Sequence, residues 1–308
     1  MLARPDPGRS AGMNGARSLL FVPATSERKI DRAFASAADG VIVDLEDAVA
    51  VSEKPAARRA LGAIVSTPRR LPIYVRVNAP STPFCYQDML AVTVAGVAGV
   101  VLPKAESADE MKTIDWLMTQ LETERGLARG GCPLMPIVET ARGLAAVDAI
   151  AAATPRIKRL LFGAVDLAAD MAIDLDDDAG AIAQARFAVA RASRAASLEA
   201  PFDTAFVDIK DGARLRASAE RARAMGFSGK ACIHPDQIEI VNEVFTPSSR
   251  ELERAARIVA AFERAEAGGA AALALDGQMI DYPVVEKARR LLDRWGKAGT
   301  APRPDSQS

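Results

Sequence analysis

The sequence predicts an α/β protein of the (β/α)8 TIM-barrel class with a C-terminal helical extension, and three observations support this fold. Eight short apolar runs recur along the chain, and each ends in polar or charged residues. The stretches between them are rich in Ala, Arg, Leu and Glu, which suit helices. The 308 residues exceed the roughly 250 that such a barrel needs. A repeated strand-then-helix order implies parallel strands, and eight units would close a barrel with its active site at the C-terminal strand ends.

Each unit begins with an expected strand. These strands cover residues 18–22, 40–44, 73–77, 100–104, 135–139, 160–163, 200–203 and 230–234. The helix-like segments that follow them cover residues 26–38, 52–65, 87–95, 108–125, 141–153, 181–197, 212–225 and 235–245. Because parallel strands bring their C-terminal ends to one face, the polar residues at these ends are the candidates for function.

Segments at both ends of the chain lie outside the eight units. Residues 1–16 contain Pro, Gly, Arg and Ser without an apolar run, which is typical of a disordered arm. Residues 246–308 contain two further helix-like runs, 248–268 and 284–295. We therefore expect a barrel domain at 17–245, preceded by the arm and followed by a helical extension. The extension either caps the barrel or reaches a neighbouring subunit.

The composition favours a small molecule as the partner and a reducing compartment. A formal net charge of -1 gives no general attraction to nucleic acid or anionic lipid, so neither is an expected partner. The three cysteines are far apart and form no CxxC pair, which is typical of a cytoplasmic protein without a structural zinc site. No run has signal-peptide character or approaches the roughly 20 apolar residues of a membrane helix. A soluble, cytoplasmic protein is expected.

His234 is the only histidine in the sequence. Multi-histidine metal sites are therefore excluded, and a Ser-His-Asp or Cys-His catalytic group could use this position alone. Carboxylates must carry most of the metal binding or proton transfer.

Two carboxylates follow neighbouring strands. Glu139 ends the fifth apolar run, and Asp166 follows the sixth. Adjacent barrel strands bring such ends together, and two converging carboxylates repel each other unless a cation or a shared proton intervenes. Mg²⁺ needs only one or two protein carboxylates, with water and substrate completing its shell. These residues therefore predict a divalent-metal site, with the alternative that Asp166 caps a helix and Glu139 pairs with an arginine.

An acidic group and an arginine follow the second and third strands. Asp44, Glu46 and Asp47 stand together, and at least one of them could reach a metal-bound water. Asp47 is thus a candidate catalytic residue, although it also suits a helix cap. Arg76 offers a planar fork that, opposite an acidic metal site, would hold the carboxylate of an oxyacid. The alternative for Arg76 is a salt bridge to these acids.

The sequence allows two interpretations each for Lys104 and His234. Lys104 follows the fourth strand, where a lysine could form a Schiff base with a carbonyl substrate in a metal-free aldolase mechanism. A charged lysine that is solvated or pairs with a carboxylate is the simpler interpretation. His234 closes the eighth strand before Pro235, and it either touches a ligand or is a structural histidine beside a helix-starting proline.

The strand-end residues belong to motifs that occur in a fixed order. They are RSLLFVP at 17–23, DLEDAV at 44–49, RVN at 76–78, LPK at 102–104, IVET at 137–140, FGAVDL at 162–167, GKACIHP at 229–235 and MID at 279–281. In this order, from Arg17 to about Trp295, they resemble the citrate lyase β-subunit-like proteins of the HpcH/HpaI aldolase superfamily. That group includes malyl-CoA and citramalyl-CoA lyases.

The resemblance implies a Mg²⁺-dependent barrel enzyme, also served by Mn²⁺, that cleaves or makes a carbon-carbon bond beside a thioester carbonyl. By matched motif, Glu139 and Asp166 would bind the metal, and Arg76 would hold the oxyacid end of the substrate. Asp281 would be the catalytic aspartate, supplied by a neighbouring subunit of a homo-oligomer, a trimer or hexamer. Contacts to CoA would come from Arg17, Lys29 and His234.

The expected activity is cleavage of a 3-hydroxyacyl-CoA of malyl or citramalyl type to a 2-oxo acid, glyoxylate or pyruvate, and an acyl-CoA. The alternatives are thioester hydrolysis at the same site, a citrate lyase β subunit acting on an acyl-carrier-protein thioester, and a non-catalytic CoA- or oxyacid-binding protein. Three features depart from the family pattern: Ala24, where glycine is common, Tyr282, and the acidic residues 174–178. They bear on the substrate more than on the metal site.

Overall fold

The computed structural model describes residues 15–175 and 180–295. Most of the arm expected at 1–16, the acidic residues 176–178 and the chain beyond Trp295 lie outside the described residues. The described residues form two compact units, a barrel and a smaller C-terminal unit.

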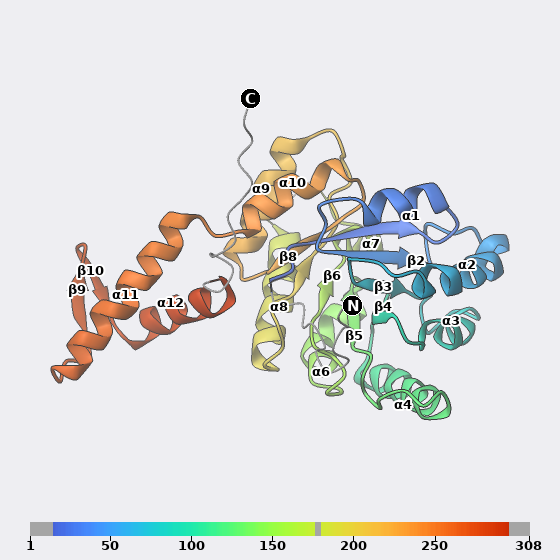
Figure 1. Ribbon diagram of the computed structural model, residues 1–308, viewed down its shortest axis with the longest axis horizontal. Coiled ribbons are helices and arrows are strands. Elements are labelled where there is room, and N and C mark those ends of the chain that lie inside the picture. Colours follow the sequence, from blue (N-terminus) through green and yellow to red (C-terminus); the bar gives the residue numbers. More distant parts are fainter. Residues whose placement is uncertain (1–14, 176–179, 296–308) are drawn as a thin grey trace, which may run out of the picture. The chain divides into compact units, whose positions relative to one another are not determined.

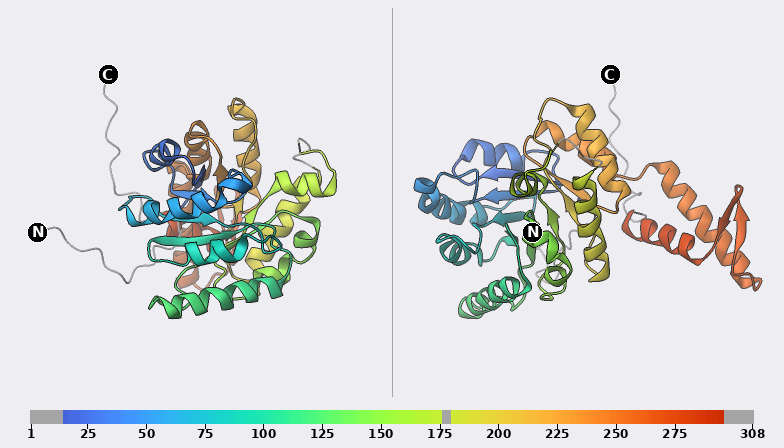
Figure 2. Two further views of the ribbon diagram at one scale, coloured as in Figure 1. Left: turned by 90° about the vertical axis from the view of Figure 1, so that its right-hand side faces the viewer. Right: turned by 180° about the vertical axis from the view of Figure 1, so that it is seen from behind.

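Residues 16–245 form a closed barrel of eight parallel strands surrounded by helices (Figures 1 and 2). Each strand pairs with the next one along the chain, and the first also pairs with the eighth, which closes the sheet. The strands are β1 (Ser18–Pro23), β2 (Gly40–Asp44), β3 (Ile73–Arg76), β4 (Val97–Leu102), β5 (Leu134–Val138), β6 (Leu161–Phe162), β7 (Phe202–Asp203) and β8 (Gly229–Cys232). The barrel fold that the apolar runs predict is confirmed.

The helices follow the strands in the expected alternation, with two local differences. The helix expected at 141–153 is divided at Ala146, and an additional helix starts directly after β6 and contains Asp166. The helices are α1 (Glu27–Phe34), α2 (Lys54–Ser66) after the 3₁₀ turn η1 (Val51–Glu53), α3 (Cys85–Val92), α4 (Ala108–Glu124), α5 (Ala141–Ala145), α6 (Val147–Ala151), α7 (Ala164–Met171), α8 (Ala181–Ala195), α9 (Gly212–Ala224) and α10 (Asp236–Phe245). Among the described residues, no helix is both long enough and apolar enough to cross a membrane.

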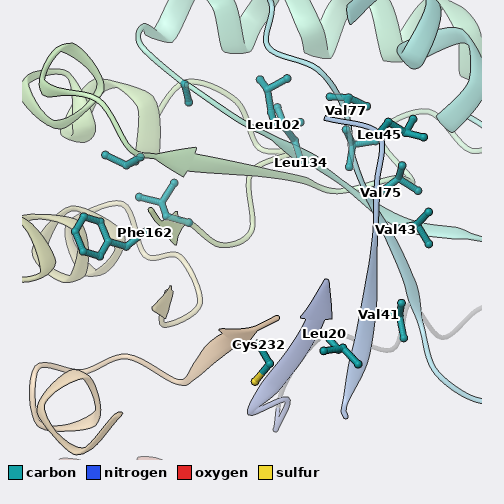
Figure 3. Packing of buried hydrophobic residues seen from close by; sticks show 14 of the residues in the cluster. Leu20, Val41, Val43, Leu45, Val75, Val77, Leu102, Leu134, Phe162 and Cys232 are labelled. Carbon is teal, nitrogen blue, oxygen red and sulfur yellow. The ribbon is translucent and has the colours of Figure 1, made fainter. Parts of the chain in front are cut away.

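Alternation along the strands divides the buried side chains between the two faces of the barrel wall. Val41, Val43 and Val75 belong to a hydrophobic cluster that also contains helix residues, and Figure 3 shows them along neighbouring strands. Ile42 and Tyr74 alternate with them and are equally buried. Because successive strand residues point to opposite faces, the second set fills the barrel interior. The next residues of the same parity, at the strand ends, are those that reach the mouth of the barrel.

Residues 246–295 form a small unit with its own hydrophobic core. Ser248 and Glu251 make a reciprocal capping box at the start of its first helix, which satisfies two backbone N–H groups. Phe262 and Ile280 are both almost fully buried in the core. The elements of this unit are α11 (Ser249–Ala267), β9 (Leu273–Leu275), β10 (Gln278–Ile280) and α12 (Tyr282–Trp295).

The β9–β10 hairpin is a feature that the sequence analysis missed. Asp276 and Gly277 join the two strands, and both have positive φ, 51° and 75°. A two-residue turn with positive φ at both positions favours the Asp-Gly pair, because its twist matches that of the strands. The Asp-Gly pair in the sequence is typical of such a turn. Strands of only three residues, however, show too little apolar alternation to predict a hairpin.

Candidate active site

A pocket of about 490 Å³ opens at the C-terminal ends of the barrel strands. Its lining includes Phe21 of β1, Asp44 of β2 and Arg76 of β3. Glu139, which directly follows β5, also lines it. Three of them follow inward-facing residues by two positions along their strands, so the strand alternation turns them to the same side. The fold therefore brings together polar residues that are far apart in the sequence.

Asp44 shapes the acidic loop that follows β2. Its two carboxylate oxygens accept hydrogen bonds from the backbone N–H groups of Glu46 at 2.9 Å and Ala48 at 3.0 Å. They also accept bonds from Nε and Nη2 of Arg76 at 2.8 and 2.7 Å. The guanidinium of Arg76 therefore forms a two-bond ion pair with Asp44. The sequence analysis gave such an ion pair as the alternative to a substrate contact.

The remaining edge of Arg76 faces the other acids of the loop. Its Nη1 lies 3.2 Å from Glu46 Oε2 and 3.7 Å from Asp47 Oδ2. The guanidinium carbon also lies 4.9 Å from the centre of the Phe21 ring. Burial lowers the pKa of Arg76, but the hydrogen bonds and charge of Asp44 and the charge of Glu46 outweigh it and raise the pKa above its usual value. Arg76 therefore remains charged at the pocket wall.

Glu46 is buried between two cations. Its Oε1 accepts a hydrogen bond from Lys104 Nζ at 2.9 Å. Its Oε2 is close to Arg76, yet among the described residues it has no hydrogen-bond partner of ordinary geometry. Burial raises the pKa of Glu46 by more than the charges of Arg76 and Lys104 lower it. One buried carboxylate oxygen therefore remains without a donor.

Glu139 follows β5 and is only 3% exposed. Its Oε1 accepts a hydrogen bond from the backbone N–H of Lys104 at 2.8 Å. Gly163 leaves the room for its other oxygen, because a Cβ at that position would come within 2.5 Å of Glu139 Oε2. Burial raises the pKa of Glu139 to about 8, and the charges of Asp166 and Glu46 add to the increase. A nearby cation would be needed to keep this carboxylate charged at neutral pH.

Asp166 lies in the first turn of α7 rather than on a strand. The helix begins where the N–H of Ala164 donates to Thr204 Oγ1 at 2.9 Å. The carboxylate of Asp166 lines the same pocket as Glu139, and its Oδ1 lies 3.6 Å from Lys104 Nζ. Asp166 therefore does not cap α7, whose N-cap is Gly163, and faces the candidate metal site from the third residue of the helix.

The donor set suits a hard divalent cation. Glu139 and Asp166 supply carboxylate oxygens to one pocket, and Gly163 leaves space beside the first of them. No cluster of three or more His, Cys, Asp or Glu arranged to hold a metal occurs in the part of the chain that the structure describes. Two carboxylates match Mg²⁺ or Mn²⁺, which accept water and substrate oxygens in their shell, whereas a structural zinc site takes four protein ligands. The residues present therefore fit Mg²⁺ or Mn²⁺.

Lys29 and His234, two of the expected CoA contacts, lie at the pocket end of the barrel. Lys29, in α1, is exposed and lines the pocket. His234 follows the lining residue Ile233, and its side chain is 41% exposed. The His234 Nδ1 accepts a hydrogen bond from the N–H of Asp236 at 3.3 Å, and its backbone N–H donates to Gln237 Oε1. These bonds are those of a residue that begins a helix, so both interpretations of His234 stay open.

Arg17 lies at the opposite end of the barrel. It precedes β1, and its Nε and Nη2 each donate to Asp39 at 2.9 Å. Its carbonyl accepts a hydrogen bond from the N–H of Lys230 at the beginning of the eighth strand. The geometry therefore gives no support to a contact between Arg17 and CoA phosphates at this pocket. The RSLLFVP motif covers the whole of β1, so its first and last residues lie at opposite barrel ends.

Asp281 belongs to the C-terminal unit. It precedes α12, where its Oδ1 accepts a hydrogen bond from Val284 N–H at 3.3 Å and its carbonyl accepts one from Val285 N–H at 3.0 Å. The flanking side chains of Met279 and Tyr282 are exposed. Asp281 therefore caps a helix within its own chain. Its catalytic role stays a prediction.

The sequence analysis missed the residues that support the acidic loop from behind. Lys54 Nζ donates to the carbonyl oxygens of Leu45 at 2.8 Å and Glu46 at 2.7 Å. Asn78 Nδ2 donates to the same Leu45 carbonyl and to Asp88. Asn78 was visible in the RVN motif, but Lys54 and Asp88 lie in helical segments where a charged residue gives no sign of burial.

Comparison with known proteins agrees with this architecture. The family described as HpcH/HpaI aldolase/citrate lyase matches residues 17–235, and the family described as C-C bond lyase of the TIM-barrel fold matches residues 190–295. The two matches together span the barrel and the C-terminal unit.

Three characterised relatives are similar over most of the chain. The citrate lyase subunit beta of Leuconostoc mesenteroides subsp. cremoris is 34% identical, over 90% of this chain and 92% of that protein. The (3S)-malyl-CoA thioesterase of Cereibacter sphaeroides strain ATCC 17025 is 37% identical, over 90% and 93% of the two chains. The L-malyl-CoA/beta-methylmalyl-CoA lyase of Rhodobacter capsulatus is 33% identical, over 94% and 96%.

A solved structure is also similar to this chain over most of its length. CitE of Mycobacterium tuberculosis, in complex with magnesium, acetoacetate and coenzyme A, matches with a TM-score of 0.73 and 34% identity over 92% of this chain and 99% of that one. The family match covers most of the barrel, and these relatives exceed 30% identity over nearly all of both chains. The chain therefore belongs to the HpcH/HpaI aldolase/citrate lyase family.

Proposed function

We propose that this protein is a Mg²⁺-dependent carbon-carbon lyase that cleaves a 3-hydroxyacyl-CoA of malyl or citramalyl type into a 2-oxo acid and an acyl-CoA. The observation that carries the proposal is the convergence of Glu139, Asp166 and Arg76 on one pocket in a member of this family. Relatives named for malyl-CoA and a relative solved with magnesium and coenzyme A support the substrate class and the cofactor.

Glu139 and Asp166 would hold the metal through carboxylate oxygens. When bound, Mg²⁺ or Mn²⁺ would stabilise the negative charge on the substrate hydroxyl oxygen as it becomes the carbonyl oxygen of the 2-oxo acid. The backbone N–H of Lys104 orients Glu139 for this task, and Gly163 keeps the space beside it open.

Arg76 would bind the carboxylate of the oxyacid part of the substrate. Asp44 holds Nε and Nη2, so the guanidinium is oriented before the substrate arrives. The free carboxylate of the substrate would then approach the Nη1 edge, where Asp47 stands exposed at 3.7 Å. Asp47 remains a candidate for proton transfer at this edge.

The reaction needs one group to take a proton and one to return it. Removal of the hydroxyl proton lets the carbon-carbon bond break, which forms the 2-oxo acid and leaves the electron pair of the bond, as an enolate, on the carbon next to the thioester carbonyl. Protonation of that carbon completes the acyl-CoA. We propose that Asp281 from a neighbouring subunit moves this proton within a homo-oligomer, a trimer or hexamer, as the family resemblance implies.

The CoA part of the substrate would lie toward Lys29. This ammonium is exposed at the pocket edge and would meet a phosphate as a point charge. His234 is a second candidate contact beside Ile233. A cytoplasmic location would match a CoA-dependent reaction and the unpaired cysteines.

Thioester hydrolysis is the second candidate function, because the chain is 37% identical to a (3S)-malyl-CoA thioesterase. The same pocket would then direct water to the thioester carbonyl, and the products would be free CoA and a hydroxy acid. A citrate lyase β subunit would instead act on an acyl-carrier-protein thioester with partner subunits.

Product analysis separates these activities. The protein is incubated with malyl-CoA, β-methylmalyl-CoA and citramalyl-CoA, with Mg²⁺ or with excess chelator, and the products are separated by chromatography. We expect equal amounts of 2-oxo acid and acyl-CoA, with Mg²⁺ only. Free CoA without 2-oxo acid would establish hydrolysis, and turnover only of acyl-carrier-protein thioesters would establish the citrate lyase role. Full activity in chelator would reject the metal and favour Lys104 as a Schiff base, which borohydride trapping detects.

Mixing two inactive variants tests whether Asp281 acts across subunits. Asp281→Ala should fold and bind metal but lose most turnover, because proton transfer contributes about 10²–10⁴-fold to such rates. Arg76→Ala should lose turnover through poor substrate binding. After subunit exchange, a hybrid oligomer contains some sites with neither substitution, so activity should return. Confirmed exchange without recovery would reject the shared site.

A further inference from the structure

Lys104 contacts three carboxylates at the mouth of the barrel. It follows β4 and donates its backbone N–H to Glu139 Oε1 at 2.8 Å. Its ammonium nitrogen lies 2.9 Å from Glu46 Oε1 and 3.6 Å from Asp166 Oδ1. Two of these three acids are the proposed metal ligands, and the proposed reaction gives the ammonium no role.

The backbone of Lys104 is also unusual. Its φ of 49° lies in the left-handed region, which is unfavourable for a residue with a Cβ. Other described non-glycine residues with positive φ are Ala172, Ser197 and Asp276, which lie at helix ends or in the hairpin turn, where this conformation is common. Lys104 instead lies at a strand end. Glycine would adopt this conformation without strain but has no ammonium, so the site uses both the backbone and the side chain of Lys104.

We propose that Lys104 is a positioning residue that competes with the metal for Asp166: its ammonium holds Asp166 and Glu46 together and opposes the charge of a divalent cation. This inference rests on the proposed metal site at Glu139 and Asp166. The metal alone would bind less tightly than the carboxylates allow, and it would be held firmly only when substrate oxygens complete its shell.

Electrostatics fixes the sign of the effect. An ammonium and a divalent cation that share one carboxylate repel each other, and water moderates the repulsion because the Lys104 side chain is 35% exposed. Removing the ammonium should therefore tighten metal binding, by roughly tenfold. Loss of a purely structural contact would have the opposite sign, because Asp166 would lose its fixed position.

Mn²⁺ binding to the metal-stripped, full-length protein tests this inference. Electron paramagnetic resonance measures the affinity for Mn²⁺ without substrate. Lys104→Gly keeps the left-handed backbone and removes the ammonium, Lys104→Met keeps the apolar stem, and Lys104→Arg keeps the charge. We expect binding to tighten roughly tenfold in the first two variants and to stay near the wild-type value in the third.

The outcomes separate the inference from the proposed function. Unchanged or weaker Mn²⁺ binding in Lys104→Gly, in protein that unfolds as cooperatively as the wild type, would overturn the role of Lys104. Tighter binding in Lys104→Gly together with weaker binding in Lys104→Met would also overturn it, because the methionine variant removes the ammonium and keeps the wild-type backbone. Absence of Mn²⁺ binding in the wild type, or binding that survives Glu139→Gln, would reject the metal site itself.

Discussion

The two ends of the barrel both bury charged clusters, but their carboxylates differ in how fully they are hydrogen-bonded. At the N-terminal end, Arg156 donates to Glu122 at 2.7 and 2.9 Å and to Asp115 at 2.6 Å. Glu122 also accepts hydrogen bonds from the N–H groups of Gly130 and Cys132. Burial raises the pKa values of Glu122 and Asp115, but these bonds outweigh it and hold both below their usual range. The carboxylates of this cluster are therefore matched by hydrogen-bond donors within it.

The carboxylates at the C-terminal end are not matched in this way. Burial and neighbouring carboxylates raise the pKa of Glu139 to about 8, and Glu46 keeps one buried oxygen without a donor among the described residues. Arg76 gives most of its hydrogen bonds to Asp44. The difference indicates that the N-terminal cluster stabilises the fold, whereas the C-terminal cluster has carboxylate charge left for a ligand.

Breaking the N-terminal cluster should have the largest effect on stability and little on catalysis. Glu122→Gln leaves the buried guanidinium of Arg156 with a weaker partner, which should cost about 3 kcal/mol in the free energy of unfolding. Urea denaturation measures this loss. The matched control is Asp148→Asn, which breaks an exposed pair with Arg191 and should cost at most about 1 kcal/mol. Equal losses in the two variants, or a changed kcat in Glu122→Gln, would remove the distinction between the two ends.

The raised pKa of Glu139 predicts a pH-dependent difference in stability when chelator removes all metal. Glu139 binds its proton more tightly in the folded than in the unfolded protein, so its stabilising contribution is present below about pH 4.5 and is lost as pH rises through about 8. Glu139→Gln removes this dependence. The wild type should therefore lose about 4 kcal/mol relative to the variant between pH 5 and pH 9. Thermal unfolding at both pH values tests this, and a constant difference would contradict it.

The same substitution at each end sharpens the comparison of the arginines. Arg76 and Arg17 both donate two side-chain hydrogen bonds to one aspartate, Asp44 and Asp39 respectively. Arg76→Lys should lower kcat/KM roughly tenfold, since lysine keeps the charge but loses the fixed fork. Arg17→Lys should leave the kinetics unchanged, because Arg17 lies away from the pocket. A raised KM in Arg17→Lys would restore its expected contact with CoA.

The barrel and much of the site could be predicted from the sequence because both depend on local periodicity. An apolar run sets a strand, and the alternation of its residues sets which polar residue at its end faces the pocket. Asp44, Arg76 and Glu139 follow this rule directly. Asp166 does not, because β6 ends early and the chain turns into a helix before reaching it.

Contacts between distant segments could not be predicted in this way. From the sequence, the guanidinium of Arg76 could bind either a substrate carboxylate or the acids at and after the end of β2. Only the folded geometry assigns its Nε and Nη2 to Asp44. The three contacts of Lys104 depend on its left-handed backbone conformation, which no sequence pattern predicts. Arg17 lies away from the pocket because its motif covers the full length of a strand, so the expected contact with CoA stays a prediction that the geometry does not support.

Mn²⁺ titration of the metal-stripped protein tests most directly whether the C-terminal cluster is a metal site. The wild type should bind one ion per chain, and Glu139→Gln and Asp166→Asn should each weaken binding by about a hundredfold or more, because an amide cannot replace the carboxylate charge. Glu122→Gln should bind Mn²⁺ as the wild type does. Wild-type affinity in both Glu139→Gln and Asp166→Asn would contradict the account.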